Sequence, residues 1–436
     1  YIQGYQNETE ELGEKQLQDT IEKLKQEYRK KDCVILYFIG LTESYEGEGY
    51  DRKNLKIPQN QEELLAEIAE TVGRDHIAAI SFGGAPMDFS FEKNVGAILH
   101  MYLGGQAVGE SVADLISGEV NPSGKLAETI PFSEKDTPAW RYFAPPNDDV
   151  EYRESIFVGY RYYETFHVPV KYPFGYGLSY TSFSYSELNV PEVYSGGKIQ
   201  IGFKIKNIGK VSGAEIAQLY VCPNESDVIR SHIELKGFQK IYLHPGEEKE
   251  VILELDERSF SVYDVEKKAF SMLSSKYQIC IGASVHDLQL KANMEVVGNS
   301  YFRNERELFP DYFREQPHGM EISAEQFYQL LGGEPKHDKE KKRGEYTVYD
   351  SYQDVVNVSM FGKFVRGVVH IGLKIILRGK SERDPAFKMV KMGVEEGNLE
   401  GLIATSGGIA TPKLIDMLVY NANKKYLQAF KRLLKK

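Results

Sequence analysis

The pattern of apolar and polar positions divides the chain into three regions of different character. In the first region, short apolar runs alternate with stretches whose apolar positions recur every three or four residues. Short apolar runs bounded by glycine are typical of buried strands, and the longer spacing predicts amphipathic helices. Strand and helix in alternation predict an α/β fold, with a mostly parallel sheet covered on both faces. The strands are expected at residues 33–39, 77–82 and 97–102, and the helices at 10–31, 61–72 and 106–116.

The second region shows period-two alternation and turn signals, without helical spacing, which predicts a fibronectin-III-like β-sandwich. Its clearest strands are expected at 199–205, 217–221, 250–255 and 277–283. The third region is helical and, after Val358, basic. A short helix is expected over 320–331, with Ser323 as the N-cap candidate for the run 324–331. The fold class is therefore α/β plus all-β, followed by a helical tail. The expected domains are a partial α/β sandwich at 1–175, the β-sandwich at 176–300 and the basic helical extension at 301–436.

Composition narrows the classes of function. The net charge of −11 argues against nucleic acid as a partner, because the phosphate backbone selects basic surfaces. Cys33, Cys222 and Cys280 are far apart and lack metal-type spacing, as do the histidines. We expect buried free thiols and a reducing, cytoplasmic compartment. No apolar run reaches the length of a membrane span. The chain opens on Tyr1 without a signal sequence, and we expect the natural N-terminus to be missing.

An acidic, glycine-containing loop follows the first predicted strand. Ligands of parallel sheets bind where strands end, so this loop lies where chemistry is expected. Glu48 stands between Gly47 and Gly49, whose conformational freedom lets a ligand approach the backbone closely. The neighbouring Glu43, Glu46 and Asp51 would raise the pKa of a carboxyl close to them in space. Composition alone favours a solvated surface loop, and the alternative is a general acid that retains its proton near neutral pH.

Several ordered motifs resemble glycoside hydrolase family 3. Residues 40–61, GLTESYEGEGYDRKNLKIPQNQ, look like that family's acid/base segment. Residues 104–110 and 118–126 resemble the end of its α/β-sandwich domain. Residues 158–163 and 172–183 resemble the passage into its fibronectin-type-III-like domain, and 235–240 with 243–247 resemble that domain's signature. The resemblance covers about residues 1–290.

The resemblance implies a retaining β-glycosidase, in which one carboxyl group is the nucleophile and a second acts first as acid and then as base. Glu48 takes the acid/base role, because a glutamate followed by Gly-Tyr-Asp-Arg carries it in the family, and Glu46 is the second candidate. Tyr50, Asp51 and Arg52 are expected to contact substrate. Arg52 is otherwise a salt-bridge partner of Asp51 or an anchor of the loop.

The family's nucleophilic aspartate belongs to a (β/α)8 barrel, and no eightfold β/α pattern occurs here. We therefore expect a fragment that begins inside the α/β domain and needs the missing barrel as its partner. The implied activity is that of a β-glucosidase on short oligosaccharides or aryl β-glycosides, without metal or organic cofactor. β-Xylosidase is the nearest enzymatic alternative, and a non-catalytic carbohydrate-binding or scaffold protein is the competing class. The sequence leaves open whether the protein forms a homodimer.

Three further features have a structural and a functional interpretation. Arg161, with its tyrosine neighbours at 160, 162 and 163, could border an aglycone site, but a packing corner between domains is favoured. Trp140, the only tryptophan, is not expected to touch substrate. The basic amphipathic segments 361–377 and 414–434 could lie on an anionic membrane, but packing on the sandwich or on the missing barrel is favoured.

Overall fold

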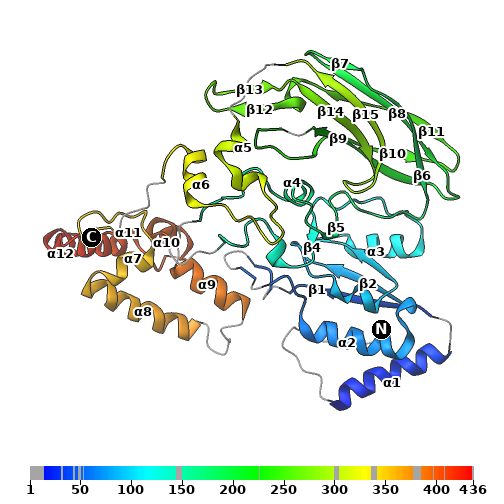
Figure 1. The fold of residues 1–436 in the computed structure, drawn as a ribbon. Coiled ribbons are helices and arrows are strands. Elements are labelled where there is room, and N and C mark those ends of the chain that lie inside the picture. The colour runs from blue at the N-terminus through cyan, green and yellow to red at the C-terminus, as the bar shows by residue number, and fades with distance from the viewer. Residues whose placement is uncertain are drawn as a thin grey trace.

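The structure is a computed structural model, and it shows an α/β part, a β-sandwich above it and a helical unit to one side (Figure 1). This order confirms the predicted fold class. The residues that it describes are 14–30, 33–42, 45–47, 51–52, 54–143, 150–224, 226–298, 304–334, 341–376, 384–395, 397–406 and 408–434.

The α/β part is built on a parallel sheet with strand order β1-β2-β3. The strands are β1 (Ile35–Gly40), β2 (Ile77–Phe82) and β3 (Ala97–His100), and the helices are α1 (Glu14–Lys30), α2 (Gln59–Val72) and α3 (Val108–Ser117). Short 3-10 helices lie at η1 (Arg74–His76), η2 (Ser90–Asn94) and η3 (Glu134–Asp136). The apolar faces of α1 and α2 pack with Ile39 and Ile77 into one core, because their apolar residues recur at helical spacing.

The expectation that helices cover both faces of this sheet is wrong for β1. Val34, Leu36 and Phe38 alternate with the covered residues of β1, and all three are exposed. Phe38 stacks on Phe82 of the neighbouring strand, with ring centroids 6.4 Å apart. Helices α1 and α2 occupy the opposite face, and α3 buries only Val112. Cys33, next to this open face, is half-buried rather than buried, whereas Cys222 and Cys280 are buried.

The β-sandwich consists of two facing sheets, with strand orders β10-β9-β14-β15-β7 and β11-β8-β6. Phe203, Phe260 and Tyr277 are among the fully buried residues between them. Alternating apolar residues, such as those of β8, supply this core because successive side chains of a strand point to opposite faces. The strands are β6 (Phe183–Asn189), β7 (Val193–Tyr194), β8 (Ile199–Asn207), β9 (Gly213–Pro223), β10 (Glu234–Leu243), β11 (Glu248–Leu255), β14 (Ser275–Gly282) and β15 (Leu288–Val296).

Smaller elements connect the sandwich to the α/β part. Strands β4 (Ile130–Pro131) and β5 (Val170–Tyr172) pair with each other, and α4 (Tyr160–Thr165) precedes β5. At the far end of the sandwich, η4 (Glu257–Phe260) leads into the hairpin β12 (Ser261–Asp264) and β13 (Ala269–Met272).

The chain after residue 304 is divided between two cores. Its first part holds α5 (Glu305–Leu308), η5 (Pro310–Phe313) and α6 (Ala324–Leu331), and packs Phe309 and Tyr312 against Phe157 and Tyr162 beside α4. The Tyr162 hydroxyl donates to Gln316 O at 2.6 Å and accepts from Gly319 N at 3.1 Å. Ser323 stands at the N-cap of α6 but its hydroxyl makes no capping bond; its backbone N–H donates to Asp311 Oδ2 instead.

Residues 341–434, with the gaps named above, form the helical unit. Val355, Val356, Leu399 and Leu418 are central to its core. Among the helices that the structure describes, none is both long and apolar enough to cross a bilayer. The helices are α7 (Tyr352–Asn357), α8 (Met360–Ile376), α9 (Pro385–Glu395), α10 (Leu399–Thr405), α11 (Pro412–Ala422) and α12 (Tyr426–Leu434).

Candidate active site

The carboxyl ends of β1, β2 and β3 form the edge from which the acidic loop departs. Backbone bonds continue past the strands: Leu41 N donates to Phe82 O at 3.1 Å, and Gly83 N donates to Tyr102 O at 3.3 Å. A Cβ atom at Gly40 would lie 2.6 Å from Phe82 O, so only glycine lets β1 and β2 end this close together. The edge is thus a tightly joined platform for the loops that follow it.

Glu46 fastens the acidic loop to this platform. Its Oε1 and Oε2 both accept from Gly84 N, at 2.8 and 2.9 Å, across 38 residues of sequence. Its own N–H donates to Thr42 O at 2.9 Å, which closes a turn at the start of the loop. A charged acceptor makes a stronger hydrogen bond than a neutral one. Because both oxygens face one backbone donor, Glu46 acts as an anchor in this arrangement.

Arg52 anchors the other end of the same loop. Its Nη2 donates to Pro86 O, and the guanidinium is half-buried. Burial lowers the pKa of Arg52, and the negative charge of Glu46 opposes that shift. Asp51 is exposed and makes no ion pair with Arg52, although both lie within the described residues. Of the two structural interpretations of Arg52, the geometry therefore matches the loop anchor.

Glu48, the predicted acid/base, and Tyr50 lie outside the described residues. What the structure provides is the position of the loop ends: Glu46 and Gly47 on one side, Asp51 and Arg52 on the other. The roles of Glu48, Tyr50, Asp51 and Arg52 toward a substrate stay predictions.

Three residues that sequence reasoning missed lie at the same edge. His100, at the end of β3, meets Ser81 Oγ through Nδ1 at 2.9 Å, and its ring lies 4.1 Å from that of Tyr102. Burial lowers the pKa of His100 to about 4, opposed by the Ser81 contact and by Glu46. Burial also raises the pKa of Glu128, a carboxyl beside Tyr102. His100 and Tyr102 could have been predicted from the sequence, because they lie at the end of a predicted parallel strand, where ligands bind.

The tyrosines beside Arg161 pack into the fold, whereas Arg161 itself is exposed. Tyr162 and Tyr163 are buried in the core beside α4, and Tyr160 stacks on Phe174 with ring centroids 4.7 Å apart. The Tyr160 hydroxyl accepts from Leu235 N of the sandwich at 2.9 Å. This geometry fits the packing corner favoured by the sequence. Trp140 is partly exposed, and its Cβ lies against Gly319.

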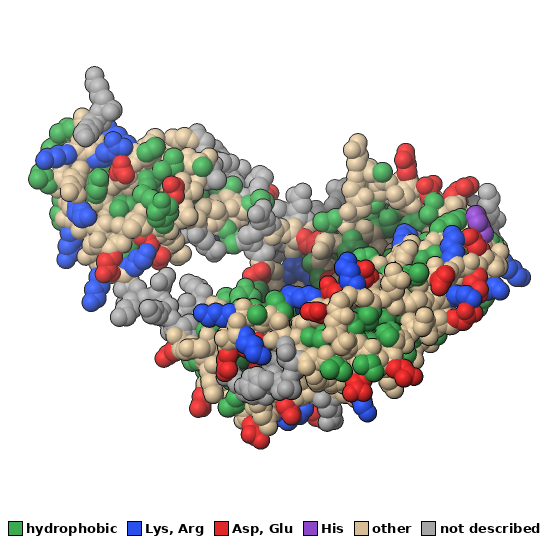
Figure 2. Space-filling view, turned by 90° about the horizontal axis from the view of Figure 1, so that it is seen from above, with side chains coloured by type: hydrophobic (Ala, Val, Ile, Leu, Met, Phe, Trp, Pro, Cys, Tyr) green, Lys and Arg blue, Asp and Glu red, His purple; other side chains and the backbone are tan. Residues whose placement is uncertain are grey.

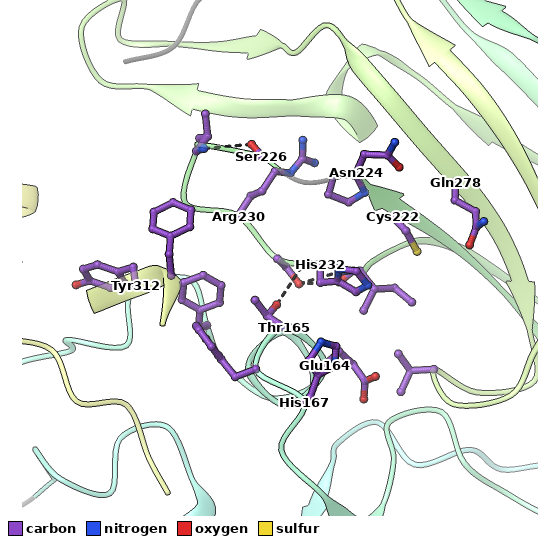
Figure 3. Close-up of a pocket in the computed structure, with 18 of the residues that line it drawn as sticks. Glu164, Thr165, His167, Cys222, Asn224, Ser226, Arg230, His232, Gln278 and Tyr312 are labelled. Atoms are coloured by element: carbon purple, nitrogen blue, oxygen red, sulfur yellow. Dashed lines mark hydrogen bonds between the residues drawn. The ribbon is translucent and has the colours of Figure 1, made fainter. Parts of the chain in front are cut away.

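A hollow of about 890 Å³ lies away from the acidic loop, between α4, the segment before β10 and η5 (Figure 3). Glu164 of α4 lines this hollow, and its carboxyl group contacts a histidine: Glu164 Oε1 lies 2.7 Å from His286 Nε2. Burial raises the pKa of Glu164, and His286 opposes the shift. His167 and His232 face each other in the hollow, with ring centroids 6.1 Å apart.

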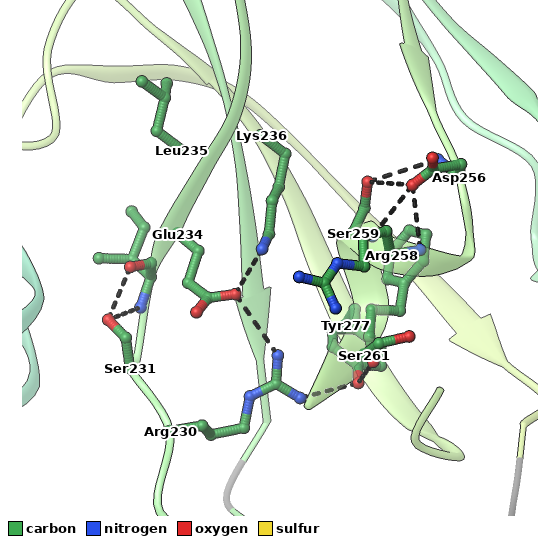
Figure 4. A network of polar contacts seen from close by, with 12 residues as sticks. Arg230, Ser231, Glu234, Leu235, Lys236, Asp256, Arg258, Ser259, Ser261 and Tyr277 are labelled. Atoms are coloured by element: carbon green, nitrogen blue, oxygen red, sulfur yellow. Dashed lines mark hydrogen bonds and ion pairs between the residues drawn. The ribbon is translucent and has the colours of Figure 1, made fainter. Parts of the chain in front are cut away.

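Arg230, on the wall of this hollow, is tied into the sandwich by a polar network (Figure 4). The buried Arg230 donates from Nη1 to the Tyr277 hydroxyl at 2.9 Å and lies 3.8 Å from Glu234 Oε2. Lys236 Nζ makes a closer ion pair with the same carboxylate, at 2.8 Å. Arg230 Nε has no hydrogen-bond partner, but the charges of Arg230, Glu234 and Lys236 offset one another. The network is therefore explained by folding, and the acidic loop remains the stronger candidate for catalysis.

Comparison with known proteins agrees with the resemblance in the sequence. Residues 1–180 match the glycosyl hydrolase family 3 C-terminal domain, and residues 215–285 match the fibronectin type III-like domain. The chain is 41% identical over 298 residues to thermostable beta-glucosidase B of Acetivibrio thermocellus, covering 68% of this chain and 38% of that protein. It is 37% identical over 273 residues to an exo-alpha-(1->6)-L-arabinopyranosidase of Bifidobacterium breve, covering 63% and 36%.

Solved structures show the same relationship. A GH3 beta-glucosidase of Bifidobacterium adolescentis is similar with a TM-score of 0.63 at 35% identity, covering 68% of this chain and 43% of that one. Beta-glucosidase 3B of Thermotoga neapolitana, in complex with alpha-D-glucose, is similar with a TM-score of 0.59 at 33% identity, covering 65% of this chain and 40% of that one. The chain belongs to glycoside hydrolase family 3 and contains that family's C-terminal domain followed by its fibronectin type III-like domain. It spans about two fifths of the length of these relatives.

Proposed function

We propose that this chain is the C-terminal part of a retaining β-glycosidase that hydrolyses terminal β-D-glucosyl residues, with Glu48 as its general acid/base. Membership of the family supports the reaction class, and the β-glucosidases among the relatives support the sugar. The observation that supports the residue assignment is the anchoring of Glu46 on Gly84 N, which fixes the start of the acidic loop, two residues before Glu48, at the carboxyl ends of β1 and β2.

Retaining hydrolysis divides the work between two carboxyl groups about 5–5.5 Å apart. In the first step Glu48 donates a proton to the glycosidic oxygen while the nucleophile attacks the anomeric carbon. In the second step Glu48 takes a proton from water, which displaces the sugar from the nucleophile. We assign the nucleophile to a barrel domain outside residues 1–436. β-Xylosidase is the alternative specificity, and aryl β-glucoside against aryl β-xyloside turnover distinguishes the two.

Glu46 is the less suitable acid because of its hydrogen bonds. A proton donor must present a protonated oxygen to the leaving group, at hydrogen-bond distance. Both Glu46 oxygens instead accept from Gly84 N, so neither can face a leaving group without giving up that contact.

The test uses the enzyme complete with its barrel. Glu48→Gln should abolish turnover of glycosides with poor leaving groups, such as cellobiose, and reduce turnover of activated aryl glycosides far less, because these leave without protonation. Azide should restore turnover and yield a β-glycosyl azide, since it attacks the glycosyl-enzyme without needing a base. Glu46→Gln is the matched control and should not yield the azide product. Full activity of Glu48→Gln on cellobiose would refute the assignment.

A second experiment separates the enzyme from the competing class of carbohydrate-binding or scaffold protein. The isolated 436 residues should not hydrolyse aryl β-glucosides, because one carboxyl group cannot run a double displacement. Adding the barrel to the same polypeptide should create the activity. Turnover by the isolated chain that depends on Glu48 would contradict this division of the site. No activity after the barrel is joined would favour the binding class.

A further inference from the structure

The helical unit exposes an apolar stripe along α8. Met360, Phe364, Val368, Ile371 and Ile375 recur on one side of the helix and are between 53% and 91% exposed. The inward side of the helix places Val365 in the core of the unit. At about 1.5 Å of rise per residue, the stripe extends over about 22 Å. Exposed apolar surface of this length marks an interaction site rather than scattered surface residues.

Helix α12 repeats this arrangement. Its large apolar residues lie outward and are between 49% and 69% exposed: Tyr426, Leu427, Phe430, Leu433 and Leu434. The inward contacts are made by the small, buried Ala429 and by Arg432, whose Nε lies 2.8 Å from Asp416 Oδ2 of α11. An amphipathic helix ordinarily turns its large apolar residues toward the core. In α12 they face away from it.

The segment that carries both stripes is positively charged. Residues 341–436 contain 18 lysines and arginines against nine acidic residues, a net charge of +9 in a chain whose net charge is −11. Neither α8 nor α12 contains aspartate or glutamate. Lys363 and Lys374 are exposed, and each follows a member of the α8 stripe by three residues, so both border the same side of the stripe. Basic and hydrophobic side chains stand together on this unit in the view from above (Figure 2).

We propose that α8 and α12 seat the protein on an anionic lipid bilayer, with their apolar stripes in the interfacial zone and their lysines among the headgroup phosphates. A helix with one apolar side and a basic polar side is the kind that lies in this zone. Negatively charged leaflets attract such basic segments. A second helical unit is the poorer occupant, because two surfaces of charge +9 repel each other. The inference does not rest on the proposed glycosidase activity.

We favour the interpretation that the sequence ranked second. Packing on the sandwich or on the missing barrel was expected; among the described residues α8 packs on α7 and α11, and α12 packs on α11, so the sandwich does not cover the stripes. Both stripes remain open after that packing. The contact is peripheral, because none of the described helices is long and apolar enough to span a bilayer.

The experiment is co-sedimentation of the full chain with vesicles. Binding is expected to phosphatidylcholine–phosphatidylglycerol vesicles at low ionic strength, to weaken as salt is added, and to be lost on pure phosphatidylcholine. The double variant Phe364→Ser with Ile371→Ser should bind at least about tenfold more weakly. Neutralising Lys363 and Lys374 to glutamine should weaken binding about 25-fold, or fivefold for each lysine.

A matched control is available on the sandwich. Phe238 and Ile252 are 66% and 51% exposed, close to the exposure of the two stripe residues, and Phe238→Ser with Ile252→Ser should bind vesicles like the parent chain. Absence of co-sedimentation with the anionic vesicles at low ionic strength overturns the proposal. So does a concentration-dependent dimer, seen by sedimentation velocity, that forms without lipid and is abolished by the stripe variant. In that case a second copy covers the stripes.

Insertion can be separated from electrostatic adhesion. Trp140 is the only tryptophan and lies outside the helical unit, so Trp140→Phe with Phe364→Trp places a single reporter in the α8 stripe. Its emission should shift to the blue, and its quenching by acrylamide should fall, when anionic vesicles are added. An unchanged emission in a chain that sediments with the vesicles would show that the stripe stays in water, and would overturn the proposed geometry.

Discussion

Replacing Glu46 by glutamine tests whether this residue anchors the loop or acts as the acid. Its two contacts share the single N–H of Gly84, so they count as one hydrogen bond. A bond to a charged group contributes about 1.5–3 kcal/mol when buried, and partial exposure of Glu46 reduces this to about 1 kcal/mol. Glutamine keeps a neutral acceptor and loses the attraction to Arg52. A loss of about 1 kcal/mol lowers the equilibrium constant between the anchored and the released loop about fivefold.

The assay is kcat/KM of the barrel-containing enzyme on a series of aryl β-glucosides. Glu46→Gln should lower kcat/KM about two- to fivefold, equally for good and poor leaving groups, since only loop placement changes. Loss of the general acid should instead cost about 100- to 10,000-fold on poor leaving groups. Glu70→Gln, on the exposed side of α2, controls for the loss of one carboxylate and should leave kcat/KM unchanged. A steep leaving-group dependence in Glu46→Gln, with azide rescue, would make Glu46 the acid and refute the anchoring role.

Two further predictions concern stability. Tyr162→Phe leaves Gln316 O and Gly319 N without their buried hydrogen-bond partner, so it should lower the free energy of unfolding by about 2–4 kcal/mol. Amide hydrogen exchange in residues 304–331 should become faster. Unchanged exchange there would contradict the docking of that segment through Tyr162. The pKa of His100 is about 4 in the folded protein, against an ordinary value of 6.5. As the pH falls, the unfolded chain therefore takes up the proton before the folded protein does. The stability that His100 contributes is complete above pH 6.5 and is lost as the pH falls toward 4. His100→Gln should flatten the fall of the unfolding midpoint between pH 6.5 and about 4, and an unaltered slope would show that His100 does not drive it.

The elements of the fold were largely predictable because their signals are local. The run at 77–82 forms β2 with the predicted bounds. Within the helix expected over 320–331, α6 covers the run 324–331 that follows the predicted N-cap. Apolar spacing fixes which side of an element must be buried, and it needs no knowledge of distant residues. The strand expected at 97–102 ends earlier, at His100, because Tyr102 adopts a positive φ of 49°.

The features that the sequence did not predict depend on tertiary contacts, which no local pattern encodes. Ser323 stands at the N-cap of α6 as predicted, but its hydroxyl makes no capping bond. The open face of β1 and the outward stripes of α8 and α12 look like core-facing patterns in sequence, because periodicity does not say what covers a face. Glu128 and Tyr102 interact although they lie in different segments of the chain, so the local sequence around one does not predict contact with the other. Glu46 was recognised as acidic, but its role as an anchor follows only from Gly84, 38 residues away.

The central claim is that Glu48 works with a nucleophile outside residues 1–436. Trapping measures this most directly: the barrel-containing enzyme is treated with an activated deoxyfluoro glucoside that forms the glycosyl-enzyme but releases it slowly, and the labelled peptide is identified by mass spectrometry. The account predicts a single covalent glycosyl adduct on a carboxylate outside residues 1–436, formed also in the Glu48→Gln enzyme. An adduct on Glu46, Glu48 or any other carboxylate within these residues would contradict it.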